Sequence, residues 1–181
     1  MSATVVGLTG PIGAGKTTVA AILRELGAKV LDADAIVQTF GTKVLGEDKE
    51  IDRAKLAALV FGDPAQLAKL ERILHPRVIA RVLEARKMLR EGEVLVIEAI
   101  KLLESGLRNV CDEIWVVIAP RAVMIERLAT RGLPRAEAEL RLGSQHSEDE
   151  FRAAADVVLE NDADRDRIKD RVRAEWTRLR G

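Results

Sequence analysis

Short apolar runs of strand length alternate along this chain with longer stretches in which apolar residues recur every three or four positions. Continuous apolar runs bounded by turn residues predict buried β-strands, and the three-to-four spacing predicts amphipathic helices. The expected strands are Thr4–Leu8, Ala28–Leu31, Val94–Ile97, Glu113–Ile118 and Asp156–Leu159. The expected helices lie near Lys16–Glu25, Asp52–Leu59, Ala65–Leu89, Pro120–Ala129, Pro134–Ser144, Ser147–Ala154 and Asp164–Leu179.

Strands that alternate with helices are typical of crossover units, so the pattern predicts an α/β fold with a parallel five-stranded sheet flanked by helices. Two excursions interrupt this alternation. Residues 39–91 form a long helical insertion that we expect to be an acceptor-binding subdomain, and the arginine-rich residues 127–145 are expected to form a mobile lid. The remaining residues, 1–38, 92–126 and 146–181, then make up a nucleotide-binding core.

Composition narrows the choice of partners. Lys plus Arg and Asp plus Glu number 29 each, and aromatic residues are only 3% of the chain, so neither charge nor stacking surface favours nucleic acid. No apolar stretch approaches the roughly 20 residues that span a bilayer, and the N-terminus lacks a secretory signal. The single Cys111 fits a reducing compartment. We therefore expect a cytoplasmic protein, a monomer or weak homo-oligomer, without nucleic-acid or membrane partners.

The stretch Gly10–Thr17 matches the phosphate-binding pattern G-x-x-x-x-G-K-[ST] and follows a predicted strand and precedes a predicted helix, as that pattern requires. Glycines let backbone N–H groups surround a phosphate, and the helix N-terminus adds partial positive charge. Lys16 is expected to reach the β- and γ-phosphates, and the Thr17 hydroxyl to contact Mg²⁺. The predicted donor is a nucleoside triphosphate.

Three carboxylates follow predicted strands. Asp32 and Asp34 come at the end of the second strand and Glu98 at the end of the third. Ligands of open α/β sheets bind beyond the carboxyl ends of the strands, so these side chains are expected to face the phosphate loop. Each aspartate is a candidate to hold Mg²⁺ through water or to accept a proton from an attacking hydroxyl, and the alternative for Asp34 is a helix cap.

Four arginines, Arg127, Arg131, Arg135 and Arg141, fall in or beside the second excursion. Guanidinium groups match phosphate oxygens and neutralise the charge that develops in phosphoryl transfer. Taken singly, each arginine fits an exposed helix face, but the cluster favours a catalytic lid in which Arg131 and Arg141 are the first candidates.

Taken together with motifs further along, the chain resembles the dephospho-coenzyme A kinases, a family of P-loop kinases. The resemblance is carried, beside the phosphate loop and the Asp32–Asp34 segment, by residues 26–28, 50–56, 60–61 and 70–76, by Leu102–Leu107, by Arg141 and Gln145, and by Ala155, Asp156 and Asn161. It implies a P-loop NTPase-type core with a helical acceptor domain and a lid. The implied reaction is ATP-dependent phosphorylation of the ribose 3′-hydroxyl of dephospho-CoA.

The resemblance also implies roles for single residues. Asp34 is similar to the general base, and Lys16 and Arg141 to the groups that stabilise the transferred phosphoryl group. Mg²⁺ is expected at Thr17 and Asp32. The residues expected to bind ATP are Gly10, Pro11, Ile12, Gly13, Ala14, Gly15, Lys16, Thr17, Thr18, Arg131 and Asn161. The residues expected on the acceptor side are Thr9, Asp32, His75, Glu98 and Leu102.

The sequence departs from the family pattern at several points. Pro11 stands where glycine is usual and removes one N–H from the loop. The family's Pro-Leu-Leu-Phe-Glu run reads here Ile100–Glu104, Phe151 replaces a basic residue, and the segment that follows Asp34 is short. Two other interpretations stay open at this point: another P-loop kinase of small molecules or nucleosides, and a nucleotide-binding protein without catalytic activity.

Overall fold

The computed structural model describes residues 3–36, 64–162 and 164–181. In these residues the five expected strands form one parallel sheet in the order β2-β3-β1-β4-β5. The strands are β1 (Thr4–Thr9), β2 (Lys29–Asp32), β3 (Val94–Glu98), β4 (Glu113–Ile118) and β5 (Val157–Glu160). The predicted α/β class and five-stranded parallel sheet are therefore confirmed, with strand ends that differ by at most one residue from those expected.

The helices also follow the predicted pattern. They are α1 (Lys16–Glu25), α4 (Pro64–Lys87), α5 (Arg121–Thr130), α6 (Arg135–Gly143), α7 (Glu148–Ala154) and α8 (Arg165–Arg180), with a 3₁₀ turn η1 at Leu107–Val110. The predicted helix at Asp52–Leu59, and the short segment after Asp34 beyond residue 36, lie outside the described residues. No helix in the described part of the chain is long and apolar enough to span a membrane.

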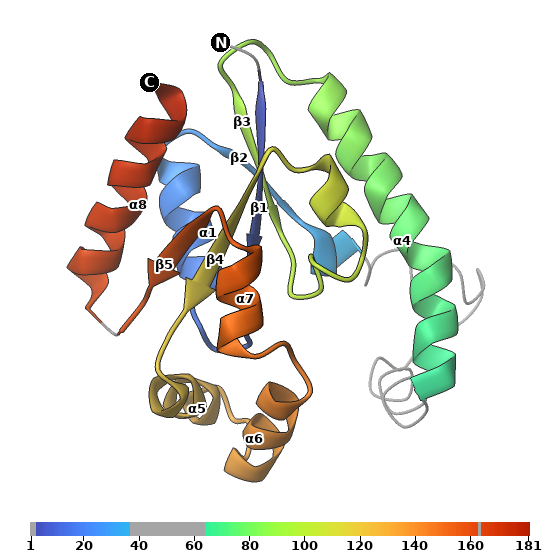
Figure 1. Cartoon of the computed structure of the whole chain (residues 1–181), viewed down its shortest axis with the longest axis vertical. Helices are drawn as coiled ribbons and strands as arrows, with labels where there is room; N and C mark the ends of the chain where they lie inside the picture. Colours follow the sequence, from blue (N-terminus) through green and yellow to red (C-terminus); the bar gives the residue numbers. More distant parts are fainter. Residues whose placement is uncertain (1–2, 37–63, 163) are drawn as a thin grey trace.

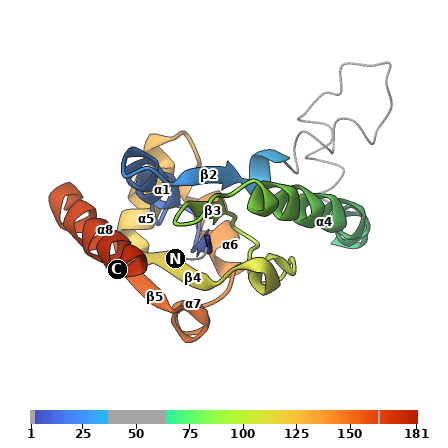
Figure 2. The same ribbon diagram turned by 90° about the horizontal axis from the view of Figure 1, so that it is seen from above.

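Side-chain alternation along the strands divides the core into two layers. Val6, Leu8, Trp115 and Val117 face a core shared with α1, α5, α6 and α8. The other sheet face packs beneath α4, η1 and α7, with residues such as Ile97 and Val116. Figures 1 and 2 show α1 and α8 on one side of the sheet and α4 and α7 on the other. Both faces are thus covered, as is usual for a parallel sheet.

The strands all run toward the lower part of the molecule in Figure 1, at whose lower end α5 and α6 lie. Register explains which side chains meet there: Asp32 on β2 pairs with Glu98 on β3, and Leu8 on β1 pairs with the same Glu98. The phosphate loop follows β1 directly. The central position of β1 in the sheet therefore places this loop between the carboxylates of β2 and β3 on one side and the lid helices on the other.

Candidate active site

The phosphate loop, residues 10–15, adopts a glycine-dependent conformation. Gly10, Gly13 and Gly15 have φ values of 143°, 82° and 105°, a region that side chains other than glycine rarely adopt. A Cβ on Gly10 would overlap the Val117 carbonyl oxygen, and one on Gly15 would overlap Nδ2 of Asn161. The loop is therefore packed against β4 and the residue that follows β5, so its shape is set by the fold around it.

Lys16 begins α1 and its side chain folds back over the loop. Its Nζ donates to the carbonyl oxygens of Gly10 at 2.7 Å and Pro11 at 3.0 Å, and the residue is only 8% exposed. Burial lowers the pKa of Lys16 to about 8, although Asp34 and Glu98 counteract it and Arg131 adds to it. The ammonium is thus held over the phosphate loop, in a place that becomes electrostatically favourable when a polyanion binds.

This depressed pKa predicts proton uptake when the triphosphate binds. At pH 8.5, above this pKa, a large part of Lys16 is neutral without nucleotide, and the phosphate charges raise its pKa, so ATP binding takes up part of a proton. The affinity for ATP therefore falls as the pH rises above about 8. Titration calorimetry at pH 8.5 in two buffers of different ionisation enthalpy measures the uptake. A binding enthalpy that is equal in the two buffers contradicts the prediction, and Lys16→Met is the control without uptake.

The three carboxylates form one acidic group beside Lys16. Oδ2 of Asp34 accepts from the Ile100 N–H at 3.2 Å, and Oε1 of Glu98 accepts from the Thr17 hydroxyl at 2.9 Å. Burial raises the pKa of Asp34 and that of Glu98, and the nearby Asp32 raises both further, whereas Lys16 lowers both. A raised pKa in a carboxylate at a cleft is a mark of a proton-transfer group.

Asp32 and Asp34 have different environments. Asp32 is exposed, and its Oδ1 accepts from the Ala35 N–H at 2.9 Å, which caps the helical turn at residues 33–36. The cap is therefore formed by Asp32, whereas the alternative interpretation placed it at Asp34. Asp34 is half-buried and points toward the segment after β3, which leaves it as the better placed of the two for proton transfer.

Two residues from distant parts of the chain hold the back of the loop. Arg127 on α5 donates to the carbonyl oxygens of Gly13 at 3.4 Å and Ala14 at 3.1 Å, and to the carbonyl and side chain of Asn161. Asn161 Nδ2 donates to the Ala14 carbonyl oxygen at 2.7 Å. Asn161, predicted for ATP binding, therefore contacts the loop directly. Arg127 was not among the leading candidates, because the sequence alone shows only one arginine among several on a helix.

The remaining predicted residues are placed as follows. Arg131 lies near enough to Lys16 and Arg127 to lower the pKa of each. Arg141 instead pairs with Glu137 one turn earlier on α6, and is half exposed. The Thr9 hydroxyl donates to the Ile100 carbonyl oxygen at 3.3 Å, His75 is half-buried on α4, and Leu102 is fully buried in the core. Thr18 lies in the first turn of α1, with its N–H on the Gly15 carbonyl oxygen.

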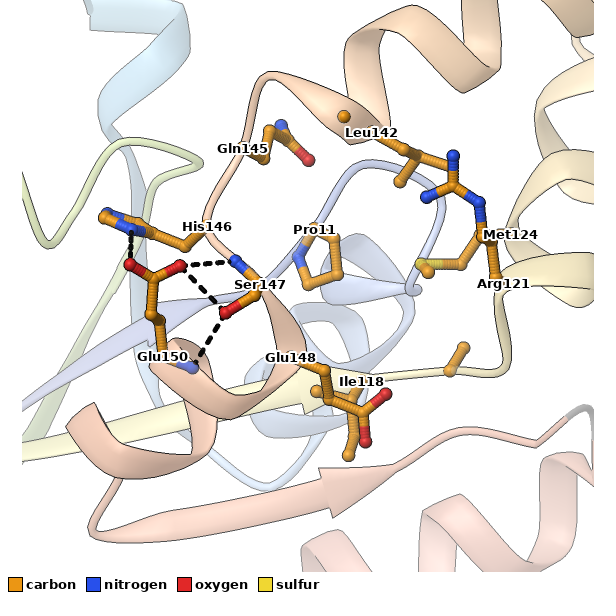
Figure 3. A pocket seen from close by; sticks show the side chains of 12 residues that line it. Pro11, Ile118, Arg121, Met124, Leu142, Gln145, His146, Ser147, Glu148 and Glu150 are labelled. Carbon is orange, nitrogen blue, oxygen red and sulfur yellow. Dashed lines mark hydrogen bonds and ion pairs between the residues drawn. The ribbon is translucent and has the colours of Figure 1, made fainter.

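A pocket of about 430 Å³ adjoins the loop on the side of α5, α6 and α7. Figure 3 shows Pro11 between Met124 and Leu142 on one side and the segment Gln145–Ser147 on the other. His146 in this segment places Nε2 3.2 Å from Glu104 and Nδ1 3.8 Å from Glu150. Ser147 and Glu150 form a reciprocal cap that begins α7. The connection from α6 to α7 is therefore anchored on both sides of the pocket.

A phosphate loop at the carboxyl edge of a parallel sheet, faced by acidic side chains and bordered by arginine-bearing helices, defines a kinase of the P-loop class. The family model described as dephospho-CoA kinase matches residues 4–167. The chain belongs to the dephospho-CoA kinase family, and as a kinase of this family it uses ATP.

Individual relatives agree with this membership. A dephospho-CoA kinase from Thermobifida fusca is 37% identical over 190 aligned residues, which cover 96% of this chain and 95% of the relative. One from Deinococcus radiodurans is 44% identical over 172 residues, covering 86% and 83%. A crystal structure of a Thermus thermophilus protein superposes with a TM-score of 0.85 at 33% identity and covers 100% of both chains.

Proposed function

We propose that this chain transfers the γ-phosphoryl group of ATP to the ribose 3′-hydroxyl of dephospho-CoA, giving CoA and ADP in the last step of coenzyme A biosynthesis. The observation that carries the proposal is the grouping of Lys16, Asp34 and Glu98 at the phosphate loop of a chain that belongs to this family. A cytoplasmic location, with a small molecule as the only acceptor, is consistent with it.

The geometry suggests a role for each group at the site. Backbone N–H groups of Gly13 and residues 15–17, at the N-terminus of α1, bind the β- and γ-phosphates. Lys16 leaves the Gly10 and Pro11 carbonyl oxygens and neutralises charge on the transferred group. Asp34 accepts the proton of the attacking 3′-hydroxyl. In-line transfer is accelerated mainly by positioning and electrostatics, so the base contributes less than the cation.

The lid and the acceptor subdomain complete this scheme. We assign residues 39–91 to acceptor binding, with His75 on α4, and residues 127–145 to the lid. Leu102 is fully buried within the segment after β3, so it does not itself contact an acceptor in this arrangement. The predicted lid boundary at residue 127 falls inside α5, so the lid consists of the last turn of α5, all of α6 and the residues around α6 up to residue 145. Arg131 already lies on the loop side. Arg141 would need to exchange Glu137 for phosphate oxygens when the lid closes.

The residues at the loop fit Mg²⁺ in the way that nucleotide-dependent enzymes usually hold it. Among the described residues no cluster of three His, Cys, Asp or Glu side chains has metal-binding geometry, so a metal site made by the protein alone is absent there. Mg²⁺ commonly binds phosphate oxygens, waters and one or two protein oxygens. The Thr17 hydroxyl would supply one of these, with Asp32 and Glu98 acting through water. When bound, the ion would neutralise phosphate charge.

Asp32 offers a test of the metal assignment. Asparagine caps a helix about as well as aspartate, so Asp32→Asn is expected to keep the stability of the protein and to raise the Mg²⁺ concentration for half-maximal activity about tenfold. Asp32→Ala should in addition lower the free energy of unfolding by about 1 kcal/mol through loss of the Ala35 cap. Mg²⁺ titrations of kcat and denaturant unfolding measure the two effects. An unchanged Mg²⁺ dependence in Asp32→Asn would remove Asp32 from the metal site.

The experiment that tests the function is a coupled assay of ADP release with ATP, Mg²⁺ and dephospho-CoA. Reactions without acceptor and with adenosine serve as controls, and CoA formation is measured beside ADP. Equal amounts of CoA and ADP, formed only with dephospho-CoA, support the proposal. Binding of ATP without acceptor-dependent turnover contradicts it and favours a nucleotide-binding protein without catalytic activity.

A further inference from the structure

One contact joins the phosphate loop to the far end of the lid. Gln145, which follows α6, accepts a hydrogen bond from the Ile12 N–H through its side-chain Oε1 at 2.9 Å. The two residues are separated by 133 positions in the chain, so the contact belongs to the tertiary structure alone. The Gln145 backbone is itself tied to α6, because its N–H donates to the Leu142 carbonyl oxygen at 3.4 Å.

The Ile12 N–H is the first backbone donor of the loop after Pro11. Pro11 has no N–H, so at this turn the loop offers the donor of Ile12 and not one from the preceding residue. The carbonyl side of the Pro11–Ile12 peptide is restrained, because the Pro11 carbonyl oxygen accepts from the Ala14 N–H at 3.2 Å and from Lys16 Nζ at 3.0 Å. The N–H of the Pro11–Ile12 peptide is therefore held by Gln145, and its carbonyl oxygen by Ala14 and Lys16.

Helix α5 contacts the loop at two further points. Arg127, at the start of the lid, donates to the carbonyl oxygens of Gly13 and Ala14. Met124 packs closely on Gly13: a Cβ added at Gly13 would lie 2.9 Å from the Met124 carbonyl oxygen. These contacts come from α5, whereas Gln145 reaches the loop from the other end of the lid. The loop is thus fastened to both ends of the segment that is expected to move.

We propose that Gln145 is a positioning residue for the phosphate transfer: its side-chain carbonyl orients the Pro11–Ile12 peptide and holds the loop in the shape that binds the triphosphate, coupled to the position of the lid. This inference rests on the proposed function for its kinetic consequences, but not for nucleotide binding. Gln145 touches neither donor nor acceptor in this scheme and acts through the loop.

The test compares Gln145→Met, which keeps the side-chain length and removes the oxygen, with Gln145→Glu, which keeps a carbonyl-type acceptor at the same place. Loss of one such hydrogen bond is expected to weaken ATP binding and raise the KM for ATP about tenfold, with kcat and the KM for dephospho-CoA changed less than threefold. The Ile12 amide resonance in ¹H–¹⁵N spectra of the nucleotide-free protein should move upfield in Gln145→Met, where the acceptor is lost, but not in Gln145→Glu, where a stronger acceptor takes its place.

Leu179→Met is the control, since it makes a conservative apolar substitution on α8, outside the phosphate loop and the lid. Its ATP affinity and Ile12 resonance should equal those of the unmodified chain. ATP binding is measured by calorimetry without acceptor, so this part of the test stands even if dephospho-CoA is not the substrate. Two results would overturn the inference: unchanged ATP affinity in Gln145→Met, or tighter binding, which would make the contact one that ATP must break.

Discussion

Replacing Lys16 by methionine is expected to lower kcat by about 10³-fold while the protein stays folded. The size of the effect follows from removing the one cation that is buried within the phosphate loop, since preorganised charges in such sites contribute about this much to transition-state stabilisation. Stability should change by no more than about 1 kcal/mol, because the lost hydrogen bonds to Gly10 and Pro11 are offset by relief of a buried charge. Steady-state kinetics and thermal unfolding check the two statements.

Lys29→Met is the matched control for this prediction. Lys29 also stands at the start of an element, β2, but it is half exposed, and its Nζ lies 2.6 Å from Oε2 of Glu93 on the surface. Its replacement should leave kcat unchanged and affect stability only slightly. If Lys16→Met retained a tenth or more of the original kcat, the assignment of Lys16 to the transferred phosphoryl group would be wrong.

Much of this architecture was predictable because it follows from local patterns. Runs such as Val94–Ile97 have no helical alternative of sufficient length, and each is followed by a stretch with helical spacing. A parallel sheet then brings all carboxyl ends to one edge. For that reason the proximity of Asp32, Asp34 and Glu98 to the phosphate loop was foreseeable from their positions at the ends of strands. The register pairs Asp32 with Glu98, Glu98 accepts from the Thr17 hydroxyl, and Asp34 and Glu98 both raise the pKa of Lys16.

The contacts that individual site residues make were less predictable. Nothing in the segment Asp32-Ala-Asp34 says which carboxylate caps the following turn, and the structure gives that contact to Asp32. Arg127 and Arg141 occupy similar sequence contexts on helices, yet Arg127 reaches the loop and Arg141 pairs with Glu137. These outcomes depend on the rotation of each helix against the sheet, and such tertiary contacts leave no local signal in a single sequence.

Gln145 illustrates the same limit. It belongs to a family-like segment, but a glutamine at a helix end is ordinarily a solvated side chain. Only the fold brings it to within hydrogen-bond distance of Ile12. The signal that would have drawn attention to it is the unusual Pro11, because a loop that loses an N–H at one position makes the remaining donors more valuable.

The second large effect is expected for Asp34→Asn, which should lower kcat about 10²-fold and leave the affinity for ATP equal or slightly higher. General-base catalysis typically raises a rate by about 10²- to 10⁴-fold. In-line phosphoryl transfer depends mainly on positioning and electrostatics, so the contribution of the base to kcat should lie near the lower end of that range. Asparagine still offers Oδ1 to the Ile100 N–H, so the site should keep its shape, while removal of a negative charge beside the triphosphate favours binding.

The pH dependence distinguishes a base from a merely structural carboxylate. Burial raises the pKa of Asp34, with Asp32 adding to it and the Ile100 N–H, Lys16 and Lys101 opposing it. The base form is therefore lost at a higher pH than for an ordinary aspartate, and kcat/KM should fall on the acid side from that raised pKa downward. This limb should vanish in Asp34→Asn.

Asp156→Asn is the matched control: Asp156 likewise accepts from a backbone N–H, that of Ile114 at 2.7 Å, but at the opposite edge of the sheet. Equal losses of kcat in the two variants, or an acid limb that persists in Asp34→Asn, would show that Asp34 shapes the site without accepting the proton.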